Sequence, residues 1–540
     1  MFEVGKDILV HSFSNSADNV DGRRRLRLVY GLFVCLFVVF AGRTVQFAVQ
    51  GTHRTRPGAG DGAWIVNRAD VIDRNGDILA KNIMSGHIAL RPRQVEDRDA
   101  VAQFVHELFP YEYSVTDVLR MIDSGRGAYI KKYATDSQRQ KVQTAKLRGL
   151  EIENVQERRY PKRRLFSHVV GFVGNELHGL EGVERTYDEY LSDNNEPLQL
   201  SLDSRVQSVF YEQLSAAMQR YSAKSAMGML MNSRTGEMIA MVSLPDFDPE
   251  NYTLDSVSNR LFKPMRATFE MGSIFKVFNT AMAMENGISR EYYVKEPFKI
   301  RDKFGRVAAT ISDIRSFKPP RPNLSVEEIM LHSCNVGSVQ IALDLPDGTQ
   351  QEFFHRVHLD EALDLEFGKT EKPLMPRRWG PVERATVSFG HGIAVTPMHL
   401  LLAVNSMTNG GIYIYPTLQK KSFGPLQGKR VLADDISARL RGVMLRIAEE
   451  TSAKQARIAG IQIGGKTATA EKRVNGKIDK FRNLTAFVGI FPVSAPQYTI
   501  LVVLDEPKGT QETFGLRTAA WNAVPTTGKI LDGILPLLFE

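Results

Sequence analysis

Cysteine is scarce in this 540-residue chain, which contains only two. Cys35 lies inside an apolar segment near the N-terminus, so we do not expect a disulfide with Cys334, and no disulfide framework supports the fold. Large exported domains can rely on hydrophobic cores instead, so this shortage does not decide the compartment. The chain also lacks internal repeats and low-complexity segments, and nothing in it indicates a repeat architecture.

A strong excess of one charge is missing as well. The 69 Lys and Arg residues face 61 Asp and Glu residues, which gives a net charge of +8. A nucleic-acid binder would gather such charge on one face, whereas here it is spread along the chain, so we expect no nucleic-acid partner. One basic cluster surrounds Tyr160-Pro161; it consists of Arg158, Arg159, Lys162, Arg163 and Arg164. It either touches an anionic polymer or lipid, or is a solvated loop.

Long apolar runs are few, and the clearest one lies near the N-terminus. Residues 28–42 carry no charge, which is short for a membrane span of about 20 residues. Arg43 can extend its side chain to the outer interface, and apolar character resumes at residues 45–49. Four arginines precede the run: Arg23, Arg24, Arg25 and Arg27. They predict that the N-terminus stays in the cytoplasm. A cleaved signal peptide is the alternative, but the residues after Phe40 make a poor cleavage site, and we expect a retained anchor.

The rest of the chain is typical of a globular protein, and its length suggests roughly three domains. A Gly/Arg/Thr-rich stretch at residues 51–62 indicates a linker, and Asn75-Gly76 indicates a tight hairpin turn. Short strands and polar helices follow. The last 340 or so residues begin and end with strand patterns and carry helices between them, which predicts an α+β fold with a mainly antiparallel sheet.

A first candidate for chemistry is the segment from Glu270 to Phe278, which has the pattern of a helix start. Lys276 follows Ser273 by three positions, so the two side chains are neighbours on a helix. A serine hydroxyl needs a nearby base to act as a nucleophile. A lysine among apolar side chains has a lowered pKa and can supply that base. By itself this spacing occurs by chance in a chain of this length.

Two later segments have ordinary interpretations when taken alone. Ser333 and Asn335 can project from one turn towards a common point, or they can cap a helix. The segment Ile463 to Ala470 predicts a strand edge, with Lys466 to Thr469 flanked by small residues. Such an edge lets a substrate backbone pair as an added strand, or it is simply a Gly-rich strand start. The glycine spacing ahead of Lys466 is wrong for a phosphate loop.

In this order the three segments resemble the penicillin-recognising serine acyltransferases. Further segments resemble motifs of class B penicillin-binding proteins: Arg68–Ala80, Arg159-Tyr-Pro161, Gly179–Glu184, Ser388–Gly392, Thr396-Pro397, Asn409–Gly411 and Asp505–Lys508. The resemblance is collinear over about residues 23–535. The chain length, the sequence before Ser273 and the form of the C-terminal segment are most similar to the septal, cell-division transpeptidase, with the elongation type as the alternative.

The resemblance implies four parts: a cytoplasmic tail over residues 1–27, a transmembrane anchor over 28–49, a non-catalytic pedestal of the dimerisation type over 50–196 and a transpeptidase domain over 197–540. It further implies a penicillin-binding and serine β-lactamase-like fold for the last part. The catalytic domain would lie in the periplasm, on the outer side of the bacterial inner membrane.

The resemblance also implies a two-step acyl transfer that cross-links peptidoglycan stem peptides at the division septum. Ser273 would be the nucleophile, Lys276 its base, and Ser333 a proton relay to the leaving amine. Asn335 would hold Lys276 and the stem peptide. The substrate or β-lactam carboxylate would bind Lys466 and Thr467, and the backbone N–H groups of Ser273 and Thr469 would form the oxyanion hole. No metal or cofactor is expected. Expected partners are a lipid-linked glycan polymerase and other division-site membrane proteins.

The sequence departs from the family pattern at three positions. Ala468 stands where most relatives have Gly, and its methyl is tolerable only if it points away from the acyl group. Met271 replaces a frequent Pro, and Cys334 a frequent Ser; neither change removes a group that the mechanism needs.

Other functions remain open at this point. A D,D-carboxypeptidase differs only in using water as the acceptor, and a serine β-lactamase shares the three elements but is normally shorter and soluble. A non-catalytic division scaffold is a further alternative, although all the reactive groups are present.

Overall fold

The computed structural model describes residues 30–43, 68–174, 176–302, 304–313, 318–421, 428–474 and 477–539. The chain divides into two compact units, Met1–Trp64 and Ile65–Glu540. In the first unit, residues 30–43 form a helix. The remainder of the predicted anchor, the predicted tail at 1–27 and the predicted linker at 51–62 lie outside the described residues. Within the described ranges, no helix combines the length and the apolar character needed to cross a membrane, so they do not support the expected spanning helix.

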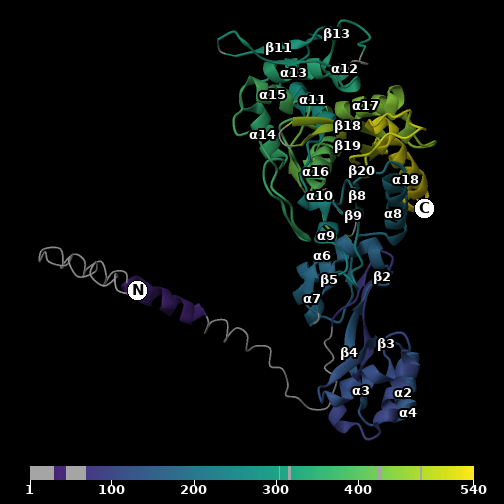
Figure 1. The fold of residues 1–540 in the computed structure, drawn as a ribbon. Helices are drawn as coiled ribbons and strands as arrows, with labels where there is room; N and C mark the ends of the chain where they lie inside the picture. The colour runs from purple at the N-terminus through teal and green to yellow at the C-terminus, as the bar shows by residue number, and fades with distance from the viewer. Residues whose placement is uncertain are drawn as a thin grey trace, which may run out of the picture. The chain divides into compact units, whose positions relative to one another are not determined.

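The second unit begins with a sheet whose strands are ordered β3-β2-β1-β7, with β4 also paired with β2 (Figure 1). These strands are β1 (Val71–Ile72), β2 (Ile78–Leu90), β3 (Ala128–Ala134), β4 (Leu150–Arg159) and β7 (Leu198–Gln199). Three helices accompany them: α2 (Arg98–Leu108), α3 (Val115–Asp123) and α4 (Asp136–Ala145). Apolar side chains from the strands and helices form one shared core, which includes Ile88, Val101 and Val118. The predicted turn at Asn75-Gly76 is confirmed: Gly76 has φ +93° and joins β1 to β2.

A buried ion network connects two of the segments that resemble family motifs, Arg68–Ala80 and Gly179–Glu184, with Arg158, which directly precedes a third. Glu184 accepts hydrogen bonds from Arg68 Nε at 2.7 Å and from Arg158 Nε at 2.7 Å, and all three side chains are fully buried. Arg158 therefore belongs to the core and not to a solvated loop. Two further members of the basic cluster pair with acids across the domain junction, Arg159 with Glu250 and Arg164 with an aspartate.

The larger part of the second unit surrounds an antiparallel sheet with strand order β18-β19-β20-β8-β9. Its strands are β8 (Ser225–Asn232), β9 (Met238–Leu244), β18 (Gly464–Val474), β19 (Lys477–Phe491) and β20 (Tyr498–Asp505). Helices α8 (Ser204–Arg220) and α18 (Ala523–Leu538) pack together on one face, where their apolar side chains share a core with the sheet (Figure 1). The α+β class with a mainly antiparallel sheet is confirmed.

The other face of this sheet carries the helices that hold the candidate site. They include α11 (Lys276–Glu285), α12 (Val326–Leu331), α13 (Asn335–Asp344), α16 (Pro397–Thr408) and α17 (Asp434–Glu450). The remaining helical segments are η1 (Pro92–Gln94), η2 (Arg163–Phe166), α5 (Ser167–Val170), α6 (Gly182–Thr186), α7 (Asp188–Asp193), α9 (Val257–Arg260), α10 (Lys263–Arg266), η3 (Gly272–Phe275), α14 (Thr349–Arg356), α15 (Pro381–Val387), η4 (Ser452–Ala456) and η5 (Ala519–Trp521). The remaining strands are β5 (Phe172–Val173), β6 (Gly179–Glu181), β10 (Tyr292–Tyr293), β11 (Phe298–Arg301), β12 (Val307–Ile311), β13 (Asn323–Leu324), β14 (Asp364–Leu365), β15 (Gly368–Lys369), β16 (Ile412–Tyr413) and β17 (Lys429–Arg430).

Candidate active site

Ser273 and Lys276 lie where the short helix η3 continues into α11. Lys276 Nζ is 2.8 Å from Ser273 Oγ, as the spacing of three residues predicts. Gly272, directly before the serine, has φ +52° and packs against β18, where a Cβ would lie 3.4 Å from Thr469 O. The turn that presents the hydroxyl is thereby held against the sheet, and glycine permits the close approach.

Ser333 lies in the loop between α12 and α13, and Asn335 is the first residue of α13. Lys276 Nζ donates a hydrogen bond to Asn335 Oδ1 at 2.7 Å and lies 3.4 Å from Ser333 Oγ. Ser333 has φ +57°, in the left-handed region that non-glycine residues seldom adopt. This conformation bends the chain back so that both side chains reach the same amine from either side of Cys334.

Lys466 reaches the same point from the edge strand β18. Its Nζ donates to Ser333 Oγ at 3.1 Å and to Thr467 O at 3.1 Å. Ser333 therefore lies between two amines, Lys276 and Lys466. Further along the strand, Thr469 Oγ1 accepts a hydrogen bond from Ala519 N at 3.0 Å, which fixes this threonine beside the η5 segment.

The methyl group of Ala468 does not face solvent. The residue is 3% exposed and belongs to the core beneath β18, opposite Ala486 on β19. The additional carbon relative to glycine is thus accommodated by packing within the sheet.

Burial makes the two lysines unlike ordinary surface amines. Both are 1% exposed. Burial lowers the pKa of Lys276 to about 8, against the opposing effect of the nearby carboxylate of Asp313. Burial also lowers the pKa of Lys466 well below its ordinary value, and repulsion by Lys276 adds to this. Near neutral pH a larger fraction of the Lys276 amine is therefore uncharged than in an ordinary lysine, and this fraction can accept a proton from the serine.

One residue of the site was missed by sequence reasoning. Asp313 accepts hydrogen bonds from the backbone N–H groups of Asn335 and Val336 and, at 3.1 Å, from Cys334 Sγ. Its carboxylate holds the first turn of α13, and with it the Asn335 side chain that contacts Lys276. The sequence signal was faint, because Asp313 is one acid in a polar stretch about 20 residues before the motif.

All seven predicted site residues occur within these three elements. Hydrogen bonds link Ser273, Lys276, Ser333, Asn335 and Lys466 directly, while Thr467 and Thr469 follow on β18. In the described part of the chain, no group of three or more His, Cys, Asp and Glu side chains is arranged to hold a metal ion. The expectation of no cofactor remains a prediction.

The model of the penicillin-binding protein transpeptidase domain matches residues 226–525, and that of the penicillin-binding protein dimerisation domain matches residues 65–209. The chain belongs to the penicillin-binding protein transpeptidase family. The predicted class B type is confirmed by the presence of both domains, and the septal type by relatives named FtsI. The proposed boundaries at residues 27, 49 and 196 remain predictions.

Individual relatives agree with this assignment. The chain is 30% identical to the probable peptidoglycan D,D-transpeptidase FtsI of Caulobacter vibrioides, over 98% of this chain and 92% of the relative. It is 29% identical to the stage V sporulation protein D of Bacillus subtilis, over 96% and 86%. The crystal structure of a peptidoglycan synthetase from Bifidobacterium adolescentis aligns with a TM-score of 0.65 at 20% identity, covering 88% of this chain and 95% of that one, which shows a common fold.

Proposed function

We propose that this penicillin-binding protein is a serine-type peptidoglycan D,D-transpeptidase that cross-links stem peptides at the division septum and is acylated by β-lactams. The observation that carries the proposal is the position of Lys276 Nζ, 2.8 Å from Ser273 Oγ and 2.7 Å from Asn335 Oδ1, in a buried setting that lowers the pKa of the amine. Few arrangements other than nucleophilic catalysis require a buried lysine against a serine hydroxyl.

In the first step Ser273 Oγ attacks the carbonyl carbon of the penultimate D-alanine. Its proton passes to Lys276 Nζ as the ester bond forms. The peptide C–N bond then breaks, and the leaving amine of the terminal D-alanine receives a proton through Ser333 Oγ, which lies between the two lysines. The product is an acyl-enzyme on Ser273 and free D-alanine.

In the second step the amine of a neighbouring stem peptide attacks the ester carbonyl. The proton of this amine passes through Lys276 to Ser273 Oγ as the ester bond breaks, and the new peptide bond joins the two stems. A β-lactam enters the first step in the same way, but its leaving amine stays tethered, so the acyl-enzyme persists.

The edge strand β18 suits the task of holding the substrate. Lys466 and Thr467 would bind the terminal carboxylate, and that negative charge would favour the protonated form of Lys466 over the neutral form favoured in the empty site. The backbone N–H groups of Ser273 and Thr469 would stabilise the oxyanion, an arrangement supported by the contact of Gly272 with Thr469. Asn335 would hold the stem peptide as well as Lys276.

We further propose that the segment at residues 28–49 anchors the protein in the inner membrane, with the N-terminus in the cytoplasm and the catalytic domain in the periplasm. Four arginines before the apolar run support this topology. A lipid-linked glycan polymerase and other division-site membrane proteins are the proposed partners, because a cross-linking enzyme acts on newly polymerised glycan.

Labelling with a fluorescent penicillin tests the proposal. Wild-type protein and a Ser289→Ala control, at an exposed serine after α11, are expected to label equally, whereas Ser273→Ala is expected not to label. Labelling that persists in Ser273→Ala would contradict the assignment of the nucleophile, and rapid loss of the label would indicate a β-lactamase.

A further inference from the structure

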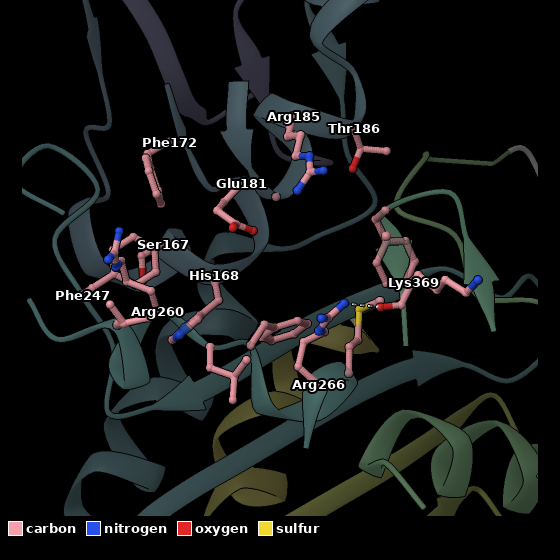
Figure 2. A pocket seen from close by; sticks show the side chains of 17 residues that line it. Ser167, His168, Phe172, Glu181, Arg185, Thr186, Phe247, Arg260, Arg266 and Lys369 are labelled. Atoms are coloured by element: carbon pink, nitrogen blue, oxygen red, sulfur yellow. Dashed lines mark hydrogen bonds between the residues drawn. The ribbon is translucent and has the colours of Figure 1, made fainter. Parts of the chain in front are cut away.

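One cavity of the described chain has a volume of about 630 Å³, and Figure 2 shows the side chains that line it. Its walls come from three stretches of chain: residues 167–186, residues 247–266 and residues 367–369. None of the seven predicted site residues lines it. The first stretch lies in the region matched by the dimerisation domain and the other two in the region matched by the transpeptidase domain, so the cavity is built by both.

The interior of this cavity is apolar and mostly buried. Its apolar lining includes Phe172, Phe247, Phe262, Met265 and Phe367. The buried imidazole of His168 stacks on one of these rings, at 5.7 Å between centroids, and burial lowers its pKa to about 4. His168 is therefore neutral near pH 7 and adds another aromatic surface. Such a lining suits an aromatic or aliphatic group of a ligand.

The rim of the cavity is cationic. Four cations line it: Arg185, Arg260, Arg266 and Lys369. Over the described ranges, none of the four forms an ion pair with a carboxylate, whereas Arg159 and Arg164 at the same junction both do. Among the described residues, Arg266 donates only to a backbone carbonyl, at 3.4 Å, and the buried Nε of Arg260 has no hydrogen-bond partner. Figure 2 shows Arg185 and Arg266 on opposite sides of the opening, with Glu181 between them.

The four cations of the rim have no acidic partners among the described residues, and they border an apolar interior. This combination suits a ligand that carries both anionic and apolar groups. Glu181 is the single carboxylate of the lining; it is exposed and can accept a hydrogen bond from an amide N–H, a donor that the phosphate group of a lipid does not provide. Two lining side chains are apolar but exposed, Val257 at 74% and Leu261 at 40%, so a ligand that covers them reaches from the interior of the cavity to its surface. An extended chain with amide groups, carboxylates and apolar side chains meets all three requirements.

We propose that this cavity binds an acidic peptide segment of a partner protein, in which Asp or Glu side chains flank an aromatic or aliphatic residue. The carboxylates bind Arg185 and Arg266, the apolar side chain enters among the phenylalanines, and a backbone N–H donates to Glu181. Because both matched regions form the walls, the bound segment contacts both at once and stabilises their present arrangement.

Panning a random heptapeptide phage library against the full chain in detergent tests the proposal. Selected peptides are expected to carry at least two acidic residues and one large apolar residue. Their affinity, measured by fluorescence anisotropy, is expected to fall at least tenfold in the Arg185→Gln/Arg266→Gln variant. A control with two exposed arginines changed elsewhere, Arg93→Gln/Arg126→Gln, is expected to bind as the wild type does.

Penicillin labelling reports folding in both variants, because neither change touches the Ser273 site. Selected peptides without an excess of acidic residues would overturn the proposal. So would peptides that bind the cavity variant and the control equally, or displacement of the peptides by neutral vesicles but not by an excess of free glutamate.

Discussion

The pH dependence of acylation follows directly from the setting of Lys276. With the pKa lowered from 10.5 to about 8 by burial, about a tenth of the amine is neutral at pH 7, roughly 300 times the fraction of an ordinary lysine. If the neutral amine takes the Ser273 proton, the rate of acylation follows this fraction. It should rise about fiftyfold between pH 6 and pH 8 and less than about twofold above pH 8.

The assay is the acylation rate constant at saturating fluorescent penicillin, measured by stopped flow between about pH 5.5 and 9.5. At saturation the ligand carboxylate stays bound to Lys466. The rise of the rate on the acid side of the pH profile, called the acid limb, therefore reports the ionisation of Lys276. The charged or ionisable groups that face this amine are Asp313, Cys334 and Lys466, and burial raises the pKa of the Cys334 thiol to about 12, which removes it from this range.

Lys472→Met is the matched control, because Lys472 lies on the same strand as Lys466. Despite burial, the carboxylates of Asp505 and Glu506 raise its pKa, so its removal should leave the acid limb in place. A rate that is flat between pH 6 and pH 8, or that still rises about tenfold per pH unit up to pH 9.5, would refute a neutral Lys276 with a lowered pKa as the base.

Three further predictions concern residues around the site and in the fold. Asp313→Asn should lower the acylation rate about tenfold, because the turn that carries Asn335 is held less firmly. It should also move the rise of the rate with pH to lower pH, because a negative charge that favours protonated Lys276 is lost. A rise that stays at the same pH would argue against this contact. Glu184→Gln should reduce the free energy of unfolding by about 3–5 kcal/mol, because it leaves the buried Arg158 without its carboxylate partner and Arg68 with Asp188 alone, whereas the exposed Glu189→Gln should change it by less than about 0.5 kcal/mol; denaturant unfolding distinguishes the two. Ala468→Gly should cost about 1 kcal/mol of stability yet leave the acylation rate within about twofold, and a large gain in rate would mean that the methyl obstructs the site.

The sequence predicted the local parts of the site best. Ser273 and Lys276 are three residues apart on one helical start, so helix geometry alone brings them together. The convergence of Lys276 and Lys466 on the hydroxyl of Ser333 depends on how α13 and β18 pack around α11, and residue spacing carries no information on that. It was expected only because the order of the segments resembles a known family.

Elements were predicted where their periodicity is strong. The apolar spacing at residues 204–219 predicts a helix, which is α8, and the β-rich runs at 485–491 and 498–504 predict strands, which lie in β19 and β20. Residues 528–538 have a helical pattern too, but the C-terminal helix begins five residues earlier, at Ala523, because the side chain of Asn522 accepts a hydrogen bond from the first helical N–H.

Buried charge was the least predictable feature. Arg158 and the arginines beside it look alike in the sequence, yet one is sealed in a core with Glu184 while others pair across the junction. Polar composition predicts exposure, and a tertiary partner 26 residues away overrides it. The same limit applies to Asp313, whose importance comes entirely from what the fold places beside it.

Peptide mass spectrometry of the protein after reaction with benzylpenicillin tests the central claim most directly. The account predicts a single penicilloyl adduct, on the peptide that contains Ser273. It predicts no adduct in Lys276→Met after the same reaction time as the wild type. An adduct on another residue, or full acylation of Ser273 without the Lys276 amine, would contradict it.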